Sequence, residues 1–191
     1  MIRALCEGDA EAYVILRRAA LLDAPLTFAS SPEDDPASSI ETVREQLRRA
    51  PEAVTFGAFQ PGLVGAVGLM RDRHLKAAHR ANIWGMYVVP EQRRKGLAAA
   101  LLEAALGHVR AMTGVSWVQL GVSSAAPEAR RLYERAGFQV WGGEEDRTLE
   151  SWRRMYWSYL VSECQRIGRV PNPSAPLVME RFDVVYAEAL R

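Results

Sequence analysis

Apolar residues in the first fifty positions recur every three or four residues in two segments, and polar residues fill the positions between them. In the first segment, Tyr13, Leu16 and Ala20 lie on one helical face. This spacing predicts a helix over residues 10–22, and Asp9 stands where it can cap the first turn.

A second helical pattern follows a polar, turn-rich loop. Its apolar residues are Ile40, Val43 and Leu47. Ser38 and Glu41 precede them with the spacing of a capping box, in which each side chain bonds the backbone of the other residue. We therefore expect a second helix that begins at Ser38.

Other segments alternate apolar and polar residues or form short β-branched runs, which is the pattern of strands. Two further helical patterns follow Gly96 and Pro127. The resulting order, βααβββαβαββ, is typical of an α+β fold with a mixed sheet. The expected strands are residues 2–5, 53–59, 63–72, 79–89, 115–124, 138–143 and 153–161.

The chain changes character after Ser162. Residues 169–176 read RVPNPSAP and predict a linker, and Pro176 opens a segment with apolar residues at helical spacing. We expect a C-terminal helix over residues 176–190. Because a lone amphipathic helix is marginal in water, we expect it to bury its apolar face in a homodimer.

Composition narrows the classes of function. Of the 191 residues, 49% are hydrophobic, which is enough for a packed core. The net charge of +1 argues against a dedicated nucleic-acid binder, because such proteins carry a basic excess. Arginines interrupt the N-terminal apolar run, and residues 62–70 are too few to cross a bilayer. Neither Cys6 nor Cys164 lies in a CxxC pair, so we expect a cytoplasmic protein with no metal site and no membrane partner.

A strand is predicted to pass directly into a helix at Arg93, Arg94, Lys95 and Gly96. The N-terminus of a helix offers unpaired backbone N–H groups and partial positive charge, and it can receive a phosphate. Gly96 lets an anion approach the backbone, and Ala98 keeps the next inward position small. In isolation this pattern is equally consistent with a solvated loop, and it matches neither a P-loop nor GxGxxG.

The surrounding residues resemble a known family. The stretch with Arg93-x-x-Gly96-x-Ala98 resembles the acyl-CoA-binding motif of the GNAT acyltransferase superfamily, and ARRLYERAGF, residues 129–138, resembles its second signature. The resemblance covers about residues 1–161. It implies a mostly antiparallel sheet of six to seven strands flanked by helices. We expect a GNAT domain over residues 1–162 and an extension over residues 163–191.

The resemblance implies transfer of an acetyl group from acetyl-CoA, as acyl donor, to a primary amine of a small molecule or protein. In such folds the pantetheine lies between two splayed strands, here residues 82–89 and 115–123. The backbone of Tyr87, Val88 and Val89 would bond its amides, and an N–H near Val88 would stabilise the oxyanion. The remaining residues expected to bind the cofactor are Arg93, Arg94, Lys95, Gly96, Leu97, Ala98, Ser124 and Tyr133.

The resemblance also makes Tyr133 the candidate general acid that protonates the leaving thiolate, whereas helical spacing alone favours a packing role. Asn82 occupies the position where some relatives carry a glutamate base. His79 and the acidic run Glu33, Asp34 and Asp35 are alternative bases, as is bulk water. Ala126 stands where relatives often have an asparagine that contacts pantetheine, so one cofactor hydrogen bond is expected to be missing.

The acceptor is hardest to infer. The acidic run at residues 33–35 could steer a cationic amine toward the site. Six aromatic residues could line a groove for it, although aromatic residues on strands also serve as core. Two other functions stay open: a non-catalytic module that binds acyl-CoA, and a binder of nucleotide phosphates. The six aromatic residues are Trp84, Trp141, Trp152, Tyr156, Trp157 and Tyr159.

Overall fold

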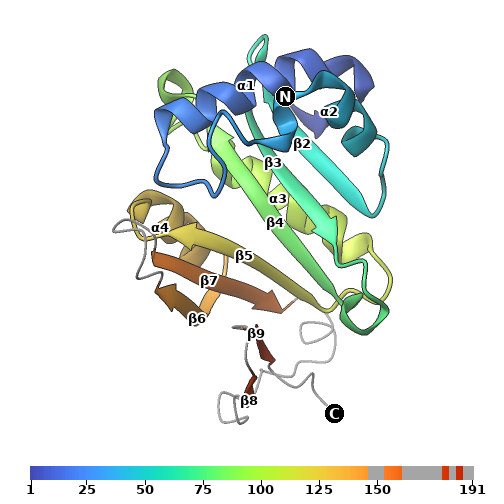
Figure 1. Ribbon diagram of the computed structural model, residues 1–191, viewed down its shortest axis with the longest axis vertical. Helices are drawn as coiled ribbons and strands as arrows, with labels where there is room; N and C mark the ends of the chain where they lie inside the picture. Colours follow the sequence, from blue (N-terminus) through green and yellow to red (C-terminus); the bar gives the residue numbers. More distant parts are fainter. Residues whose placement is uncertain (146–152, 161–177, 181–183, 187–191) are drawn as a thin grey trace.

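The computed structural model describes residues 1–145, 153–160, 178–180 and 184–186, with side chains up to residue 140. Seven strands form one sheet in the order β1-β2-β3-β4-β5-β7-β6 (Figure 1). They are β1 (Ile2–Ala4), β2 (Ala53–Phe59), β3 (Leu63–Arg71), β4 (Arg80–Val88), β5 (Trp117–Ser123), β6 (Gln139–Glu145) and β7 (Arg153–Leu160). Only β4 and β5 pair in parallel, so the expected mixed, mostly antiparallel sheet is confirmed.

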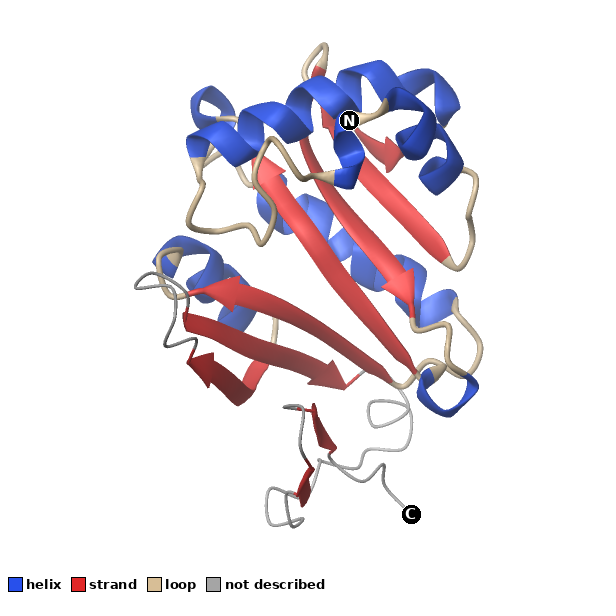
Figure 2. Ribbon diagram, in the orientation of Figure 1, coloured by secondary structure: helices blue, strands red, loops and turns tan. Residues whose placement is uncertain are grey.

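Helices cover both faces of this sheet (Figure 2). On one face, α1 and α2 pack around Tyr13, Leu16 and Val43. On the other, the long α3 and the short α4 enclose the larger core, which includes Leu101, Leu102 and Tyr133. The helices are α1 (Ala10–Asp23), α2 (Ile40–Leu47), α3 (Leu97–Ala111) and α4 (Pro127–Arg135). No helix in the described ranges has the length and apolarity needed to cross a membrane.

Both predicted helix caps at the N-terminal end are wrong in detail. Asp9 makes no cap bond to α1, because its carboxylate is held by the guanidinium of Arg3 at 2.6 and 2.7 Å. The cap of α2 is Ser39 rather than Ser38, and its hydroxyl accepts a hydrogen bond from the backbone N–H of Thr42. Ser38 instead ends a short 3₁₀ turn that Asp35 caps.

The predicted C-terminal helix is also wrong. Within residues 176–190, the described segments are two short antiparallel strands, β8 (Val178–Glu180) and β9 (Val184–Tyr186). The expected linker at 169–176 lies outside the described residues. The homodimer and the boundary after residue 162 stay predictions.

A bulge in β4 determines the geometry of the functional site. Trp84 pairs with Gly68 and Tyr87 pairs with Ala66, so β4 has one residue more than β3 in this interval. Gly85, inside the bulge, has a φ of 64°, a left-handed conformation that glycine adopts without strain. The parallel pairing of β4 with β5 ends at Ile83 and Leu120, and beyond these residues the two strands diverge (Figure 1).

Candidate active site

A cavity of about 720 Å³ opens where β4 and β5 diverge. Its walls come from four parts of the chain: the second half of β4, the loop and first turn of α3, the end of β5, and α4. The loop after α1 adds Ala24, Thr27 and Phe28. Of the predicted site residues, the cavity brings together Tyr87, Val88, Arg93, Arg94, Gly96, Leu97, Ala98 and Tyr133.

The N-terminus of α3 faces this cavity without a protein cap. Gly96 is the residue before the helix, with a φ of 80°, and no side chain bonds to the first turn. Leu97, Ala98 and Ala99 follow it along the cavity wall, so their backbone N–H groups lack intrahelical partners there. Arg94 also has a positive φ, 61°, and lines the cavity. The expected anion cradle therefore has open donors and an adjacent cation.

The backbone of β4 offers the cavity fewer groups than expected. The N–H of Val89 donates to the carbonyl of Val64 at 2.9 Å, and its carbonyl accepts from Gln92 at 3.0 Å. The prediction that the Val89 backbone is free for a ligand is therefore wrong. Because antiparallel residues alternate in direction, Tyr87 also turns its backbone to β3, whereas Val88 turns away from β3 toward the gap.

Arg93 was expected to bind the cofactor, but its side chain contacts other groups of the protein. Its Nε donates to the carbonyl of Val88 at 3.0 Å, and its Nη2 forms a short ion pair with Asp23 at the end of α1. Tyr87 donates its hydroxyl to the same carboxylate at 3.3 Å, and its ring lies 5.6 Å from the Arg93 guanidinium carbon. These contacts tie the C-terminal end of α1 to the loop that precedes α3.

Tyr133 lies on α4 at the cavity wall. Its side chain is 5% exposed and packs against Phe138 at 5.8 Å between ring centroids. Burial raises the pKa of Tyr133 well above its ordinary value, so the phenol stays protonated across neutral pH. Tyr133 is among the residues that line the cavity.

Three other predicted residues lie outside the cavity lining. Lys95 is exposed and donates to Gln92 at 2.8 Å. Ser124 is also exposed, and the neighbouring Ser123 lines the cavity in its place, with its hydroxyl accepting from the N–H of Ala125. Asn82 is half-buried, and its oxygen accepts from Gln119 Nε2 at 2.6 Å. The structure therefore does not bring Asn82 to the other predicted catalytic residues.

The acidic run after α1 is mainly structural. The carboxylate of Asp35 is buried and pairs with Arg17 at 2.5 Å, and it also caps the backbone of Ala37. Asp34 accepts two bonds from Ser31. Two of the three acids expected to steer a cation are thus engaged within the protein, and only Glu33 is exposed without a bond among the described residues.

His79 and most of the aromatic residues do not help to define the acceptor site. His79 stands one residue before β4 and six residues before Gly85, which is about 20 Å of extended chain, so it lies far from the gap. Of the six aromatic residues, Trp84 lines the cavity. The side chains of Trp141, Trp152, Tyr156, Trp157 and Tyr159 lie outside the described residues.

Comparison with known proteins identifies the family. Residues 18–138 match the model of the acetyltransferase (GNAT) family, which is well over half of the chain. The chain belongs to the GNAT acetyltransferase family. Acetyl transfer is the general reaction of this family, so the cavity between β4 and β5 belongs to an acetyltransferase fold.

Solved structures support the same fold at low sequence identity. A GNAT-family acetyltransferase from Streptococcus pneumoniae is 20% identical, with a TM-score of 0.73 over 85% of this chain and 99% of that one. The protein yncA from Salmonella typhimurium, solved with its cofactor acetyl-CoA, is 16% identical, with a TM-score of 0.71 over 85% and 94%. A ribosomal-protein-alanine N-acetyltransferase from Brucella melitensis is 17% identical, with a TM-score of 0.70 over 84% and 99%.

A second family model, that of the ASCH domain, matches residues 136–186. It overlaps the GNAT match at residues 136–138. The strands β6 and β7 lie in this second match, yet β7 pairs with β5 in the same sheet as the GNAT strands. The last two strands of the main sheet therefore come from a segment that resembles an ASCH domain.

Sequence reasoning missed Asp23, Gly85 and Phe28. Asp23 bonds Arg93 seventy positions away, a pairing that no local pattern reveals. The glycine within the β-branched strand at residue 85 is a signal for a bulge, and it could have been interpreted in that way. Phe28 packs edge-on against Tyr87, with centroids 6.5 Å apart, and closes the cavity from the α1 side.

Proposed function

We propose that this protein is an N-acetyltransferase that transfers the acetyl group of acetyl-CoA to a primary amine by direct attack. One observation carries the proposal. A single cavity joins the open N-terminus of α3, the inward-facing backbone of Val88 and the buried side chain of Tyr133. These are an anion site, an oxyanion donor and a proton donor, the three groups that the proposed thioester transfer uses.

Each group in the cavity has a separate role in the proposed reaction. The N–H groups from Leu97 to Ala99, with Arg94, bind the pyrophosphate of acetyl-CoA. The Val88 N–H donates a hydrogen bond to the thioester oxygen and stabilises the negative charge that develops on it. The amine nitrogen forms its bond to the carbonyl carbon, the carbon–sulfur bond breaks, and Tyr133 gives its proton to the departing thiolate. The proton lost by the amine passes to water, water returns a proton to the Tyr133 phenolate, and Asn82 takes no part in this transfer.

Release of free CoA thiol tests the proposal. The full chain is incubated with acetyl-CoA and a mixture of primary amines, and thiol release is followed with and without the amines. We expect turnover that depends on the amines. Tyr133→Phe keeps the ring and its packing but removes the proton, so turnover should fall about 10²–10⁴-fold with little change in acetyl-CoA affinity.

Tyr13→Phe is the matched control. Tyr13 is also a buried tyrosine, but it packs against α2 on the other face of the sheet and does not line the cavity. It should keep wild-type turnover. Acetyl-CoA binding without any amine-dependent release would instead favour the non-catalytic module, and a Tyr133→Phe variant with full turnover would remove the acid assignment.

A further inference from the structure

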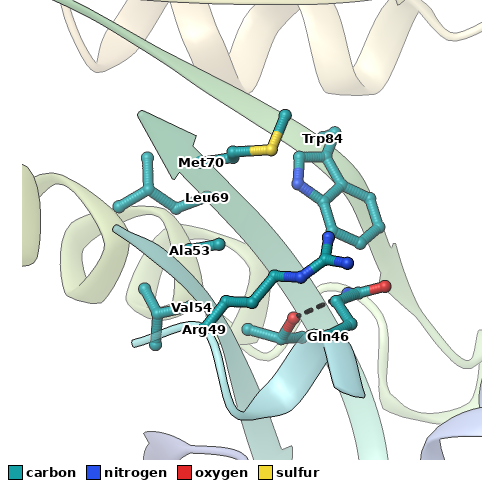
Figure 3. A pocket seen from close by; sticks show the side chains of 8 residues that line it. Gln46, Arg49, Ala53, Val54, Leu69, Met70 and Trp84 are labelled. Carbon is teal, nitrogen blue, oxygen red and sulfur yellow. Dashed lines mark hydrogen bonds between the residues drawn. The ribbon is translucent and has the colours of Figure 1, made fainter. Parts of the chain in front are cut away.

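A second, smaller cavity of about 200 Å³ lies at the C-terminal end of α2 (Figure 3). Trp84 lines both this cavity and the large one. The two spaces therefore share Trp84 of β4 as a wall. Val88 follows Trp84 by four residues, so the small cavity lies about 13 Å or less along the strand from the proposed oxyanion donor.

The floor of the small cavity is apolar and belongs to the α1 and α2 face of the sheet. Ala53 pairs with Met70, and Met70 pairs with Asn82, two residues before Trp84 on the same face. Gly68 sets the position of the indole, because an added Cβ there would lie 2.2 Å from Trp84 Cε2. The flat ring therefore rests directly on the neighbouring strand, beside Met70.

One charged side chain stands at this cavity. Arg49, just after α2, extends toward the Trp84 indole (Figure 3). It is exposed and has no carboxylate partner among the described residues, whereas Arg48 pairs with Glu7 at 2.6 Å. An uncompensated guanidinium beside an apolar floor favours a ligand with an anionic end and an apolar body.

We propose that the small cavity is the anchoring part of the acceptor site, and that the acceptor is an amine joined through an apolar body to a carboxylate. The carboxylate binds Arg49, the body lies against Trp84 and Met70, and the amine reaches past Gly85 to the thioester. This assignment of substrate class rests on the proposed acetyl transfer for the role of the amine. The anion subsite itself depends only on Arg49 and its cavity.

Straight-chain amino acids with a terminal amine test this assignment, because their amines resemble those of the matching alkylamines in basicity. The probes are ω-aminohexanoate, ω-aminooctanoate and ω-aminodecanoate, each compared with the alkylamine of the same chain length. For the length that spans the two cavities, we expect kcat/KM to favour the amino acid by at least roughly tenfold. Shorter and longer members should show a smaller preference.

Two neighbouring arginine variants localise the effect. Arg49→Gln should abolish the preference for the carboxylate by raising KM for the amino acids alone. Arg48→Gln changes a neighbouring arginine that is also exposed but lies outside the cavity, and it should keep the preference. Acetyl-CoA affinity should be the same in both variants, and their circular dichroism should match that of the wild type.

Calorimetric titration with ω-aminooctanoate in the presence of CoA separates this inference from the proposed function. Binding that Arg49→Gln removes, without turnover of any amine, would support the subsite and refute acetyl transfer. Turnover with the same carboxylate preference in wild type and Arg49→Gln would overturn the subsite and leave acetyl transfer in place. Absence of any carboxylate preference in the wild type, in both binding and turnover, would also overturn it.

Discussion

Replacement of Gly96 by alanine tests whether the N-terminus of α3 holds the pyrophosphate. A Cβ built on Gly96 meets no heavy atom within 4 Å, so the variant creates no clash inside the protein. It points into open space beside the amides of the first helical turn. A ligand phosphate that contacts those amides would have to move away from the new methyl group.

The expected effect has two separable parts. At a φ of 80°, an L-residue other than glycine costs about 1–2 kcal/mol of stability, partly offset by the lower entropy of its unfolded chain. Acetyl-CoA binding should weaken at least roughly tenfold, which corresponds to about 1.4 kcal/mol, because several charge-assisted hydrogen bonds lengthen.

Gly114→Ala is the control for backbone strain. Gly114 has the same φ of 80°, and its added Cβ would lie no closer than 3.5 Å to another heavy atom. It does not line the cavity. It should lose similar stability in urea unfolding and keep wild-type affinity for acetyl-CoA.

Calorimetric titration with acetyl-CoA and with S-acetylpantetheine, which lacks the pyrophosphate, gives the decisive comparison. Only acetyl-CoA should lose affinity in Gly96→Ala. An unchanged affinity for acetyl-CoA in a folded Gly96→Ala variant, or an equal loss for both ligands, would refute a phosphate site at this helix end.

Two further predictions concern Asp23 and Tyr13. Asp23→Asn should loosen Arg93 and raise KM for acetyl-CoA several-fold with kcat unchanged, while Glu11→Gln, on the same helix but paired with Arg44, should do neither. Burial raises the pKa of Tyr13 to about 12, above about 10 in an unfolded chain, so folding holds its proton and stability falls as pH rises between these values. The wild type should lose up to about 3 kcal/mol of unfolding free energy through this ionisation, and Tyr13→Phe should not, when both are unfolded in urea across this pH range. An equal fall of unfolding free energy with pH in both proteins would contradict the assignment.

The order of helices and strands could be predicted from the sequence because each core element has strong periodicity and a clear turn at its end. Gly137, for example, ends α4 with a φ of 92°. The cap at Ser39 was missed by one residue because Ser38 and Ser39 are both good caps, and the 3₁₀ turn at Pro36–Ser38 decides between them. The prediction of a helix over residues 176–190 was wrong because valines at helical spacing also suit short strands.

The site was predictable where a motif depends on backbone conformation, and not where it depends on partners distant in sequence. The positive φ of Gly96 follows from its place at a strand-to-helix junction. The direction of Arg93 depends on Asp23, and the choice between Val88 and Val89 depends on the register against β3. The pairing register decides which face a side chain points to and which neighbouring strand its backbone bonds. The sequence of one strand alone does not determine that register.

The bulge at Gly85 connects the two halves of the site. In a regular strand, residues three apart point to opposite faces, yet Trp84 and Tyr87 both belong to the α1 and α2 side. The extra residue shifts the pleat by one, so one ring precedes Gly85 along the strand and the other follows it. Both rings lie on the face of the sheet from which the proposed acceptor arrives. The same shift turns the side chain of Val88 into the α3 core, and its backbone faces the gap. A glycine with positive φ in mid-strand therefore sets both the approach to the thioester and the donor that faces it.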